Sequence, residues 1–150
     1  MISFKEMLLQ EQEAPIIGKV PKNAEEDYGM ELIMDLHDCD ISKSNRKDIE
    51  NFLEQLCKLI DIIRVYIHWW DYSGDKEGYD RDWKEHPHLV GTSVCQFIST
   101  SSIVIHTIDP FKKVFLNIFS CKTFDSKIAE DFAVKFFDGT VASSHTLIRK

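Results

Sequence analysis

The chain lacks an apolar run long enough to cross a membrane, because no stretch of its 150 residues approaches the roughly 20 apolar residues that a spanning helix needs. It also lacks an internal repeat and a low-complexity tract. With 43% hydrophobic and 29% charged residues, the composition is that of an ordinary globular protein. The length fits one domain with a single substantial core.

Cysteine is scarce, and its spacing excludes two classes of site. The four cysteines are Cys39, Cys57, Cys95 and Cys121. They form neither a CxxC pair nor a zinc-binding spacing. The first ten residues do not have the form of an export signal, so we expect reduced thiols and a cytoplasmic protein. Asp82, His86 and His88 lack a further ligand at a fixed spacing, so we expect no metal.

Positive charge is also in short supply. The formal net charge is −7, and the sequence pI is near 5.3. Phosphate groups would be repelled, so neither nucleic acid nor an anionic membrane is expected as a partner. A small-molecule substrate remains compatible with this charge.

Hydrophobic periodicity predicts an α+β fold. Strands are expected over residues 30–36, 63–67, 92–98, 103–107, 114–119 and 140–148. One helix should follow a cap at Ser42 or Ser44, and a second should follow a cap at Asp125 or Ser126. Residues 73–88 are polar and are expected to form a long loop. This order predicts a two-layer α/β sandwich, an antiparallel-rich sheet with two helices on one face.

The N-terminal segment stands apart from this pattern. Pro15, Gly18 and Pro21 interrupt any regular element there. We therefore divide the chain into an arm or extension over residues 1–27 and one domain over residues 28–150.

The residues with chemical potential gather in two places. Thr100 to Thr107 forms a hydroxyl-rich turn that leads into a strand bearing His106. Taken alone, His106 is more typical of a buried or hydrogen-bonded structural histidine than of a catalytic one. Trp69 and Trp70 begin an aromatic-rich segment, which either anchors a loop over the sheet edge or forms a stacking wall for a substrate.

Spacing joins four of these residues into one pattern. Ser93 precedes Ser101 by eight positions, His106 follows Ser101 by five, and Cys121 follows it by twenty. With the Ile105-His106-Thr107 tripeptide and the opening run from Tyr28 to Cys39-Asp40, this set resembles the prokaryotic-type S-adenosylmethionine decarboxylase proenzymes. Members of that family are pyruvoyl enzymes that cut their own chain at a serine.

The resemblance implies a function and a role for each residue. The chain would break between Thr100 and Ser101, and Ser101 would become the pyruvoyl cofactor, a ketone that holds the substrate amine and accepts electrons during decarboxylation. By resemblance, His106 is the base in the elimination, Ser93 stabilises the oxyanion, and Cys121 is the acid that protonates the carbanion. The expected activity is decarboxylation of S-adenosylmethionine for spermidine synthesis. The expected assembly is a homodimer, made of cleaved heterodimers if the chain is processed.

Departures from the family pattern keep other functions open. Thr100 and Ser102 stand where the family has glutamate and histidine. Because Ser101 and Ser102 are adjacent serines, a cut at Ser102 remains an alternative. Ile108 replaces an aromatic residue, and Pro87-His88 occupies the neighbourhood of a phenylalanine. These changes concern substrate recognition. The expected substrate-binding residues are Trp69, Trp70 and Ile108.

Two alternative functions follow from these departures. One is a pyruvoyl decarboxylase of arginine or ornithine, whose cationic group would meet acidic residues of the loop. Those acids are Asp71, Asp75, Asp80 and Asp82. The other is an uncleaved, non-catalytic homologue that binds a metabolite.

Overall fold

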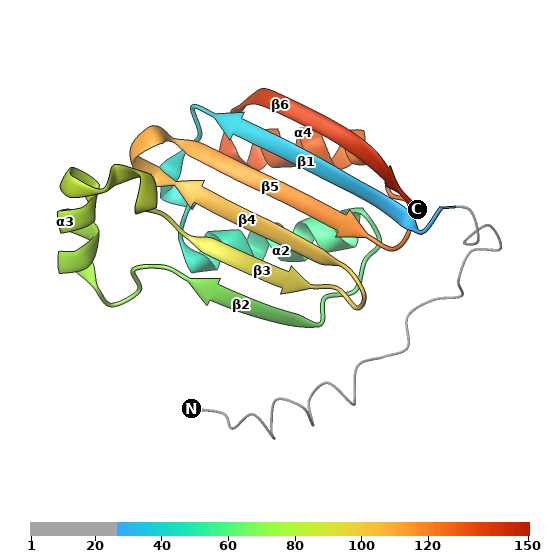
Figure 1. Cartoon of the computed structure of the whole chain (residues 1–150), viewed down its shortest axis with the longest axis horizontal. Helices are drawn as coiled ribbons and strands as arrows, with labels where there is room; N and C mark the ends of the chain where they lie inside the picture. Colours follow the sequence, from blue (N-terminus) through green and yellow to red (C-terminus); the bar gives the residue numbers. More distant parts are fainter. Residues whose placement is uncertain (1–26) are drawn as a thin grey trace, which may run out of the picture.

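A six-stranded antiparallel sheet organises the protein (Figure 1). The computed structural model describes residues 27–150, so the arm expected over residues 1–27 lies outside the described residues except for its last one. The strands are β1 (Gly29–His37), β2 (Tyr66–Trp70), β3 (Ser93–Phe97), β4 (Ser102–Ile108), β5 (Lys113–Ser120) and β6 (Thr140–Arg149). Their order in the sheet is β2-β3-β4-β5-β1-β6, with β2 and β6 at the edges.

Two helices cover one face of the sheet and leave the other uncovered (Figure 1). These are α2 (Arg46–Leu59) and α4 (Ser126–Phe137). The predicted two-layer α+β sandwich is therefore confirmed. The expected cap of α4 is correct, since Asp125 Oδ1 accepts a hydrogen bond from the backbone N–H of Ile128 at 3.0 Å.

The expected cap of the first helix at Ser42 or Ser44 is wrong. Asn45 caps α2, and its Oδ1 accepts a hydrogen bond from the Asp48 backbone N–H at 3.0 Å. Ser42 lies instead in a short 3-10 helix, η1 (Ile41–Lys43), whose cap is Asp40. Two polar caps within six residues allow two helix starts, and the longer helix begins at the second.

The core lies between the helices and the covered face of the sheet. Phe52 of α2 is fully buried and packs against the rings of Phe132, Phe136 and Phe137 at centroid distances of 5.3, 5.1 and 4.9 Å. Alternate residues of the central strands complete the core, for example Ile103 and Ile105. Burial of these groups supplies the main driving force for folding.

The predicted loop over residues 73–88 is wrong in part, because it contains a helix, α3 (Lys76–Glu85). Asp75 caps it through a hydrogen bond from the Gly78 backbone N–H to Oδ1 at 2.9 Å. The helix stands beyond the end of the sheet (Figure 1) and buries only Gly78. It therefore has no apolar stripe that periodicity can detect. Two 3-10 turns pack beside it, η2 (Pro87–Leu89) and η3 (Asp109–Phe111).

No helix of residues 27–150 has the length and apolar character needed to cross a bilayer.

The contact between Phe52 and α4 should dominate the stability of the sandwich. Phe52→Ala should lower the free energy of unfolding by about 3–5 kcal/mol, because it removes a buried ring and leaves a cavity. Phe111→Ala is the control, since that ring is half exposed and its loss should cost about 0.5 kcal/mol or less. Equal losses in urea unfolding of the two variants would contradict this account of the core.

Candidate functional site

Antiparallel pairing places three parallel rows of side chains on the uncovered face of the sheet. The first row is Trp70, Ser93, His106, Phe115, Asp35 and Ser143. The second is His68, Cys95, Val104, Asn117, Ile33 and His145, and the third is Tyr66, Phe97, Ser102, Phe119, Glu31 and Leu147. Because side chains alternate between faces, every member of a row points away from the helices.

Ser93 and His106 form a pair in the first row. They are register partners on β3 and β4, and a hydrogen bond of 2.8 Å joins Ser93 Oγ to His106 Nδ1. The imidazole is exposed on the uncovered face. The pair is therefore a hydroxyl hydrogen-bonded to an accessible imidazole, an arrangement suited to general acid–base chemistry.

Ser101 and Cys121 form a second pair at the other end of β4 and β5. Ser101 precedes β4, its side chain is buried, and its Oγ accepts a hydrogen bond from the Cys121 backbone N–H at 2.7 Å. The hairpin turn closes with a hydrogen bond from the Ile98 N–H to the Ser101 carbonyl at 3.0 Å. Within the turn, Ser99 has a φ of 64°. Such a conformation is unfavourable for a residue with a Cβ atom, so backbone strain is stored one peptide away from the Thr100–Ser101 bond.

The two pairs do not meet within one chain. Ser101 and His106 lie five residues apart along an extended strand, which corresponds to about 16 Å between their Cα atoms. The structure brings together Ser93 with His106 and Ser101 with Cys121, and it separates the first pair from the second.

The three expected substrate-binding residues lie in different surroundings. Trp69 packs on the covered face against the core, and the Arg46 guanidinium lies 5.8 Å from its ring centre. Trp70 is a register partner of Ser93 on the uncovered face and is 56% exposed. Ile108 follows His106 on the same face and is half-buried. Only Trp70 and Ile108 are therefore beside the Ser93–His106 pair.

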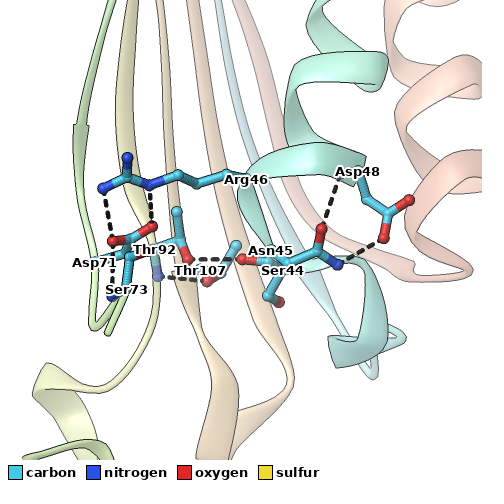
Figure 2. A network of polar contacts seen from close by, with 8 residues as sticks. All are labelled: Ser44, Asn45, Arg46, Asp48, Asp71, Ser73, Thr92 and Thr107. Atoms are coloured by element: carbon cyan, nitrogen blue, oxygen red, sulfur yellow. Dashed lines mark hydrogen bonds and ion pairs between the residues drawn. The ribbon is translucent and has the colours of Figure 1, made fainter. Parts of the chain in front are cut away.

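The four acids considered for a cationic substrate all bind groups of this chain. Asp71 holds Arg46 through two hydrogen bonds of 2.6 and 2.9 Å (Figure 2). Asp75 caps α3, and Asp80 forms an ion pair with Lys76 at 2.5 Å. Asp82 accepts a hydrogen bond from the Tyr72 hydroxyl at 2.8 Å. None of the four is directed at His106 as an uncommitted carboxylate.

Asp35 is a site residue that sequence reasoning missed. It shares the first row with His106, and both line a depression of about 250 Å³ on the uncovered face. The alternation of apolar residues in β1 could have shown it, because Leu32, Met34 and Leu36 are buried and Asp35 must then face the other way.

Asp109 is the second missed residue, and its burial is unusual for a carboxyl group. Its side chain is only 7% exposed. It accepts hydrogen bonds from the Thr107 hydroxyl and the Tyr79 hydroxyl, both at 3.0 Å. Burial raises the pKa of Asp109, while the hydrogen bonds from Thr107, Tyr79 and Ser44 partly oppose that rise. No periodic pattern marks such a residue, since Asp109-Pro110 reads as an ordinary turn.

A hydrogen-bonded cluster around Asp109, the Asp109 cluster, connects the start of β3 and the end of β4 to the residues before α2. Its other members are Ser44, Tyr79, Thr92 and Thr107. The Thr92 backbone N–H donates to Thr107 Oγ1 at 2.8 Å, and the Thr92 hydroxyl donates to the Ser44 carbonyl at 2.6 Å (Figure 2). Gly91 fits here because a Cβ atom would lie 1.8 Å from the Thr107 carbonyl oxygen. A cavity of about 520 Å³ adjoins the cluster, between the first turn of α2 and α3.

The remaining thiols and possible metal ligands offer no second centre in the described chain. Burial raises the pKa values of Cys39 and Cys57 to about 11, so both thiols stay protonated near neutral pH. Among residues 27–150, no three histidine, cysteine, aspartate or glutamate side chains are grouped closely enough to hold a metal ion.

Comparisons with known proteins identify the family of this chain. The family model for S-adenosylmethionine decarboxylase matches residues 30–150. The chain belongs to the S-adenosylmethionine decarboxylase family. That family is one of carboxy-lyases, so the Ser93–His106 and Ser101–Cys121 pairs lie in the domain of a decarboxylase family.

A solved member of the S-adenosylmethionine decarboxylase family has the same fold. The crystal structure of the adenosylmethionine decarboxylase from Aquifex aeolicus matches with a TM-score of 0.62 and 20% sequence identity. The match covers 82% of this chain and 91% of that chain. A comparison with curated protein sequences gives no match.

The buried Asp109 should give the unfolding free energy a component that depends on pH. Because its pKa is raised in the folded state, the native protein binds a proton there in a pH range where the unfolded chain does not. This stability is present at low pH and is lost as the pH rises from the unfolded value of about 3.9 through the folded value. Asp109→Asn should remove this component, so the variant should gain stability relative to the parent as the pH rises.

Urea unfolding at several pH values between about 4 and 7 measures the effect. Asp80→Asn is the control for an exposed carboxylate on α3. Parallel stability–pH curves for Asp109→Asn and the parent protein would contradict the assigned role of burial.

Proposed function

We propose that this protein is a self-processing, pyruvoyl-dependent decarboxylase of S-adenosylmethionine that acts in spermidine synthesis. The observation that carries the proposal is the setting of Ser101. Its buried hydroxyl accepts a hydrogen bond from the Cys121 backbone N–H and lies next to a turn with a left-handed serine. Ser102, by contrast, belongs to the third row of the uncovered face, between Phe97 and Phe119. This difference supports a cut at Ser101.

The self-cleavage consists of three steps on the chain itself: an acyl shift, an elimination and a hydrolysis. The Ser101 hydroxyl attacks the Thr100 carbonyl, the amide bond breaks, and an ester forms while the Ser101 nitrogen becomes an amine. Loss of the Ser101 α-proton then expels the Thr100 carboxylate and leaves a dehydroalanine. Water adds to its imine tautomer and ammonia departs, which leaves a pyruvoyl group at the start of residues 101–150. The strain at Ser99 favours the first step, because breaking the peptide releases it.

The residues around Ser101 fit a pyruvoyl group. Its ketone supplies the electron sink that decarboxylation of an amine-bearing carbon requires. Cys121 is adjacent to Ser101 through their hydrogen bond, so its thiol is the proposed proton donor to the carbon that loses carbon dioxide. His106 is the proposed base for the α-proton of Ser101. Ser93, hydrogen-bonded to His106 Nδ1, is the proposed group that stabilises the oxyanion of the acyl shift.

The separation of the two pairs supports a second copy of the chain as the source of the His106 that acts on Ser101. His106 lies about 16 Å along β4 from the Ser101 of its own chain, which is too far for proton transfer. Beyond the first row, the uncovered face also carries four large apolar side chains that are each more than one-third exposed: Ile33, Tyr66, Phe97 and Leu147. A homodimer in which two such faces pack together would bury them and would bring the His106 of one copy to the Ser101 of the other.

Decarboxylation of ornithine or arginine is the second candidate function. The observation that favours it is Asp35, a carboxylate in the same row as His106 that lines the adjacent depression. A carboxylate at that position would attract the distal ammonium or guanidinium group of a basic amino acid. The replacement of a family aromatic by Ile108 agrees with a substrate that has no adenine ring.

Intact mass measurement tests self-processing. The parent chain of 17.5 kDa should convert into two fragments that separate before residue 101, with the C-terminal fragment carrying a pyruvoyl terminus. Ser101→Ala should abolish the conversion, while the matched control Ser102→Ala should still cleave. A single uncut mass for the parent after long incubation would contradict the proposal and favour a non-catalytic, ligand-binding homologue.

Release of labelled carbon dioxide identifies the substrate. Carboxyl-labelled S-adenosylmethionine, ornithine and arginine are supplied separately to cleaved protein, with Ser101→Ala as the blank. We expect release from S-adenosylmethionine. Release from ornithine or arginine alone would transfer the assignment to the second candidate.

A further inference from the structure

An aromatic cluster leads from α3 to the first row of the uncovered face. Its members are Trp70, Tyr72, Tyr79 and Trp83. Trp70 meets Tyr72 edge-on at 5.5 Å, Tyr72 meets Tyr79 edge-on at 5.6 Å, and Tyr79 lies 5.7 Å from Trp83. Edge-to-face contacts at these distances are favourable and orient the rings relative to one another. The orientation of Trp70 therefore depends on the position of Tyr72 and Tyr79.

Hydrogen bonds fix the two tyrosines of this cluster. The Tyr72 hydroxyl donates to Asp82 Oδ2 at 2.8 Å, and the Tyr79 hydroxyl donates to Asp109 Oδ2 at 3.0 Å. The two acceptors differ in kind. Asp82 belongs to α3 itself, whereas Asp109 follows β4 and connects α3 to the sheet.

Two further hydrogen bonds fix Asp109, which accepts the hydrogen bond from the Tyr79 hydroxyl. The other carboxylate oxygen of Asp109 accepts from the Thr107 hydroxyl, and the Asp109 backbone N–H donates to the Val90 carbonyl at 2.9 Å. None of the ion pairs within residues 27–150 includes Asp109. Burying a carboxyl group without a cationic partner opposes folding. Asp109 nevertheless connects α3 to the sheet, because Tyr79 of α3 donates to its carboxyl group.

The aromatic cluster ends beside the Ser93–His106 pair. Trp70 is a register partner of Ser93, whose hydroxyl binds His106, and its exposed indole is the nearest aromatic surface to that pair on β2. A substrate with a conjugated ring or a sulfonium group gains by stacking on such an indole face.

We infer that Tyr79 is a positioning residue: held by Asp109, it sets through Tyr72 the orientation of Trp70, which forms the substrate-stacking surface beside Ser93 and His106. The segment between β2 and β3 is thus a specificity element. This inference rests on the proposed function for the identity of the substrate, and on the structure alone for the coupling of Tyr79 to Trp70.

Fluorine NMR tests the coupling without any substrate. The chain has three tryptophans, so 5-fluorotryptophan labelling gives one resonance each for Trp69, Trp70 and Trp83, assigned by single replacement with phenylalanine. Tyr79→Leu should shift and broaden the Trp70 resonance. Trp69, on the same strand but the opposite face, should keep its resonance and is the internal control. Tyr72→Leu, which leaves Asp109 untouched, should have the same effect on Trp70 if Tyr79→Leu fails to fold.

Steady-state kinetics test the consequence. Tyr79→Leu should raise KM for S-adenosylmethionine about tenfold while kcat changes less than about twofold, because a stacking contact formed in the ground state is weakened. Tyr79→Phe keeps the ring contacts but loses the hydrogen bond to Asp109, so its KM should lie between those of the parent and Tyr79→Leu. Asp80→Ala, one residue further on the same helix, should match the parent. Self-cleavage should proceed in all three variants.

Either of two results would overturn the inference. One is an unmoved Trp70 resonance in folded Tyr79→Leu and Tyr72→Leu. The other is a moved resonance with an unchanged KM. Failure of the proposed function gives a different result, since a protein that decarboxylates no substrate still yields the resonances.

Discussion

The antiparallel register of β4 with β3 and β5 is the constraint on which the site depends. It pairs His106 with Ser93 on one side and Phe115 on the other, and it brings the residue before β4 to the residue after β5. A slip of one residue would send His106 into the core and Ile105 to the uncovered face. The buried side chains of Ile103 and Ile105 under α2 and α4 prevent that slip. The core of the sandwich thus holds the chemistry in register without contributing a reacting group.

The extended conformation of β4 also keeps the two residue pairs of one chain apart. The Ser93–His106 and Ser101–Cys121 pairs occupy opposite ends of β4, so one chain holds the parts of the proposed site at two separate places. The uncovered apolar face offers a direct physical reason for association, since its exposed rings and aliphatic chains would leave water in a dimer. In this account the dimer is required by the catalytic geometry as well as by the surface.

Much of the fold follows from the sequence, and the failures have identifiable causes. The alternation of β1, β4 and β5 and the apolar face of α2 are strong patterns, and the structure confirms the elements they predict. Helix α3 was not predicted because its stability comes from the Asp75 cap and from tertiary contacts of Tyr79, which leave no apolar stripe. The predicted start of the first helix, at Ser42 or Ser44, is wrong because Asp40 and Asn45 both act as caps, of η1 and α2 respectively.

The candidate site was only partly predictable for a related reason. Resemblance to the family's spacing identified Ser93, Ser101, His106 and Cys121, but spacing does not state whether the residues of one chain meet. Trp69 and Trp70 are adjacent in sequence and lie on opposite faces, a difference that depends on the phase of β2. The alternation of β1 places Asp35 on the uncovered face, but its position in the row of His106 and the contact of Asp109 with Tyr79 depend on long-range pairing, which local patterns do not encode.

Complementation between two inactive chains tests the central claim, that His106 of one copy acts on Ser101 of another, most directly. Differently tagged His106→Ala and Ser101→Ala chains are expressed alone and together, and their masses are measured. Each should stay uncut alone. In the mixture the account predicts cleavage of the His106→Ala chain, which keeps Ser101 and receives the imidazole of its partner, while the Ser101→Ala chain stays intact. Mixed dimers in which neither chain is cut, although the parent protein cleaves under the same conditions, would contradict it.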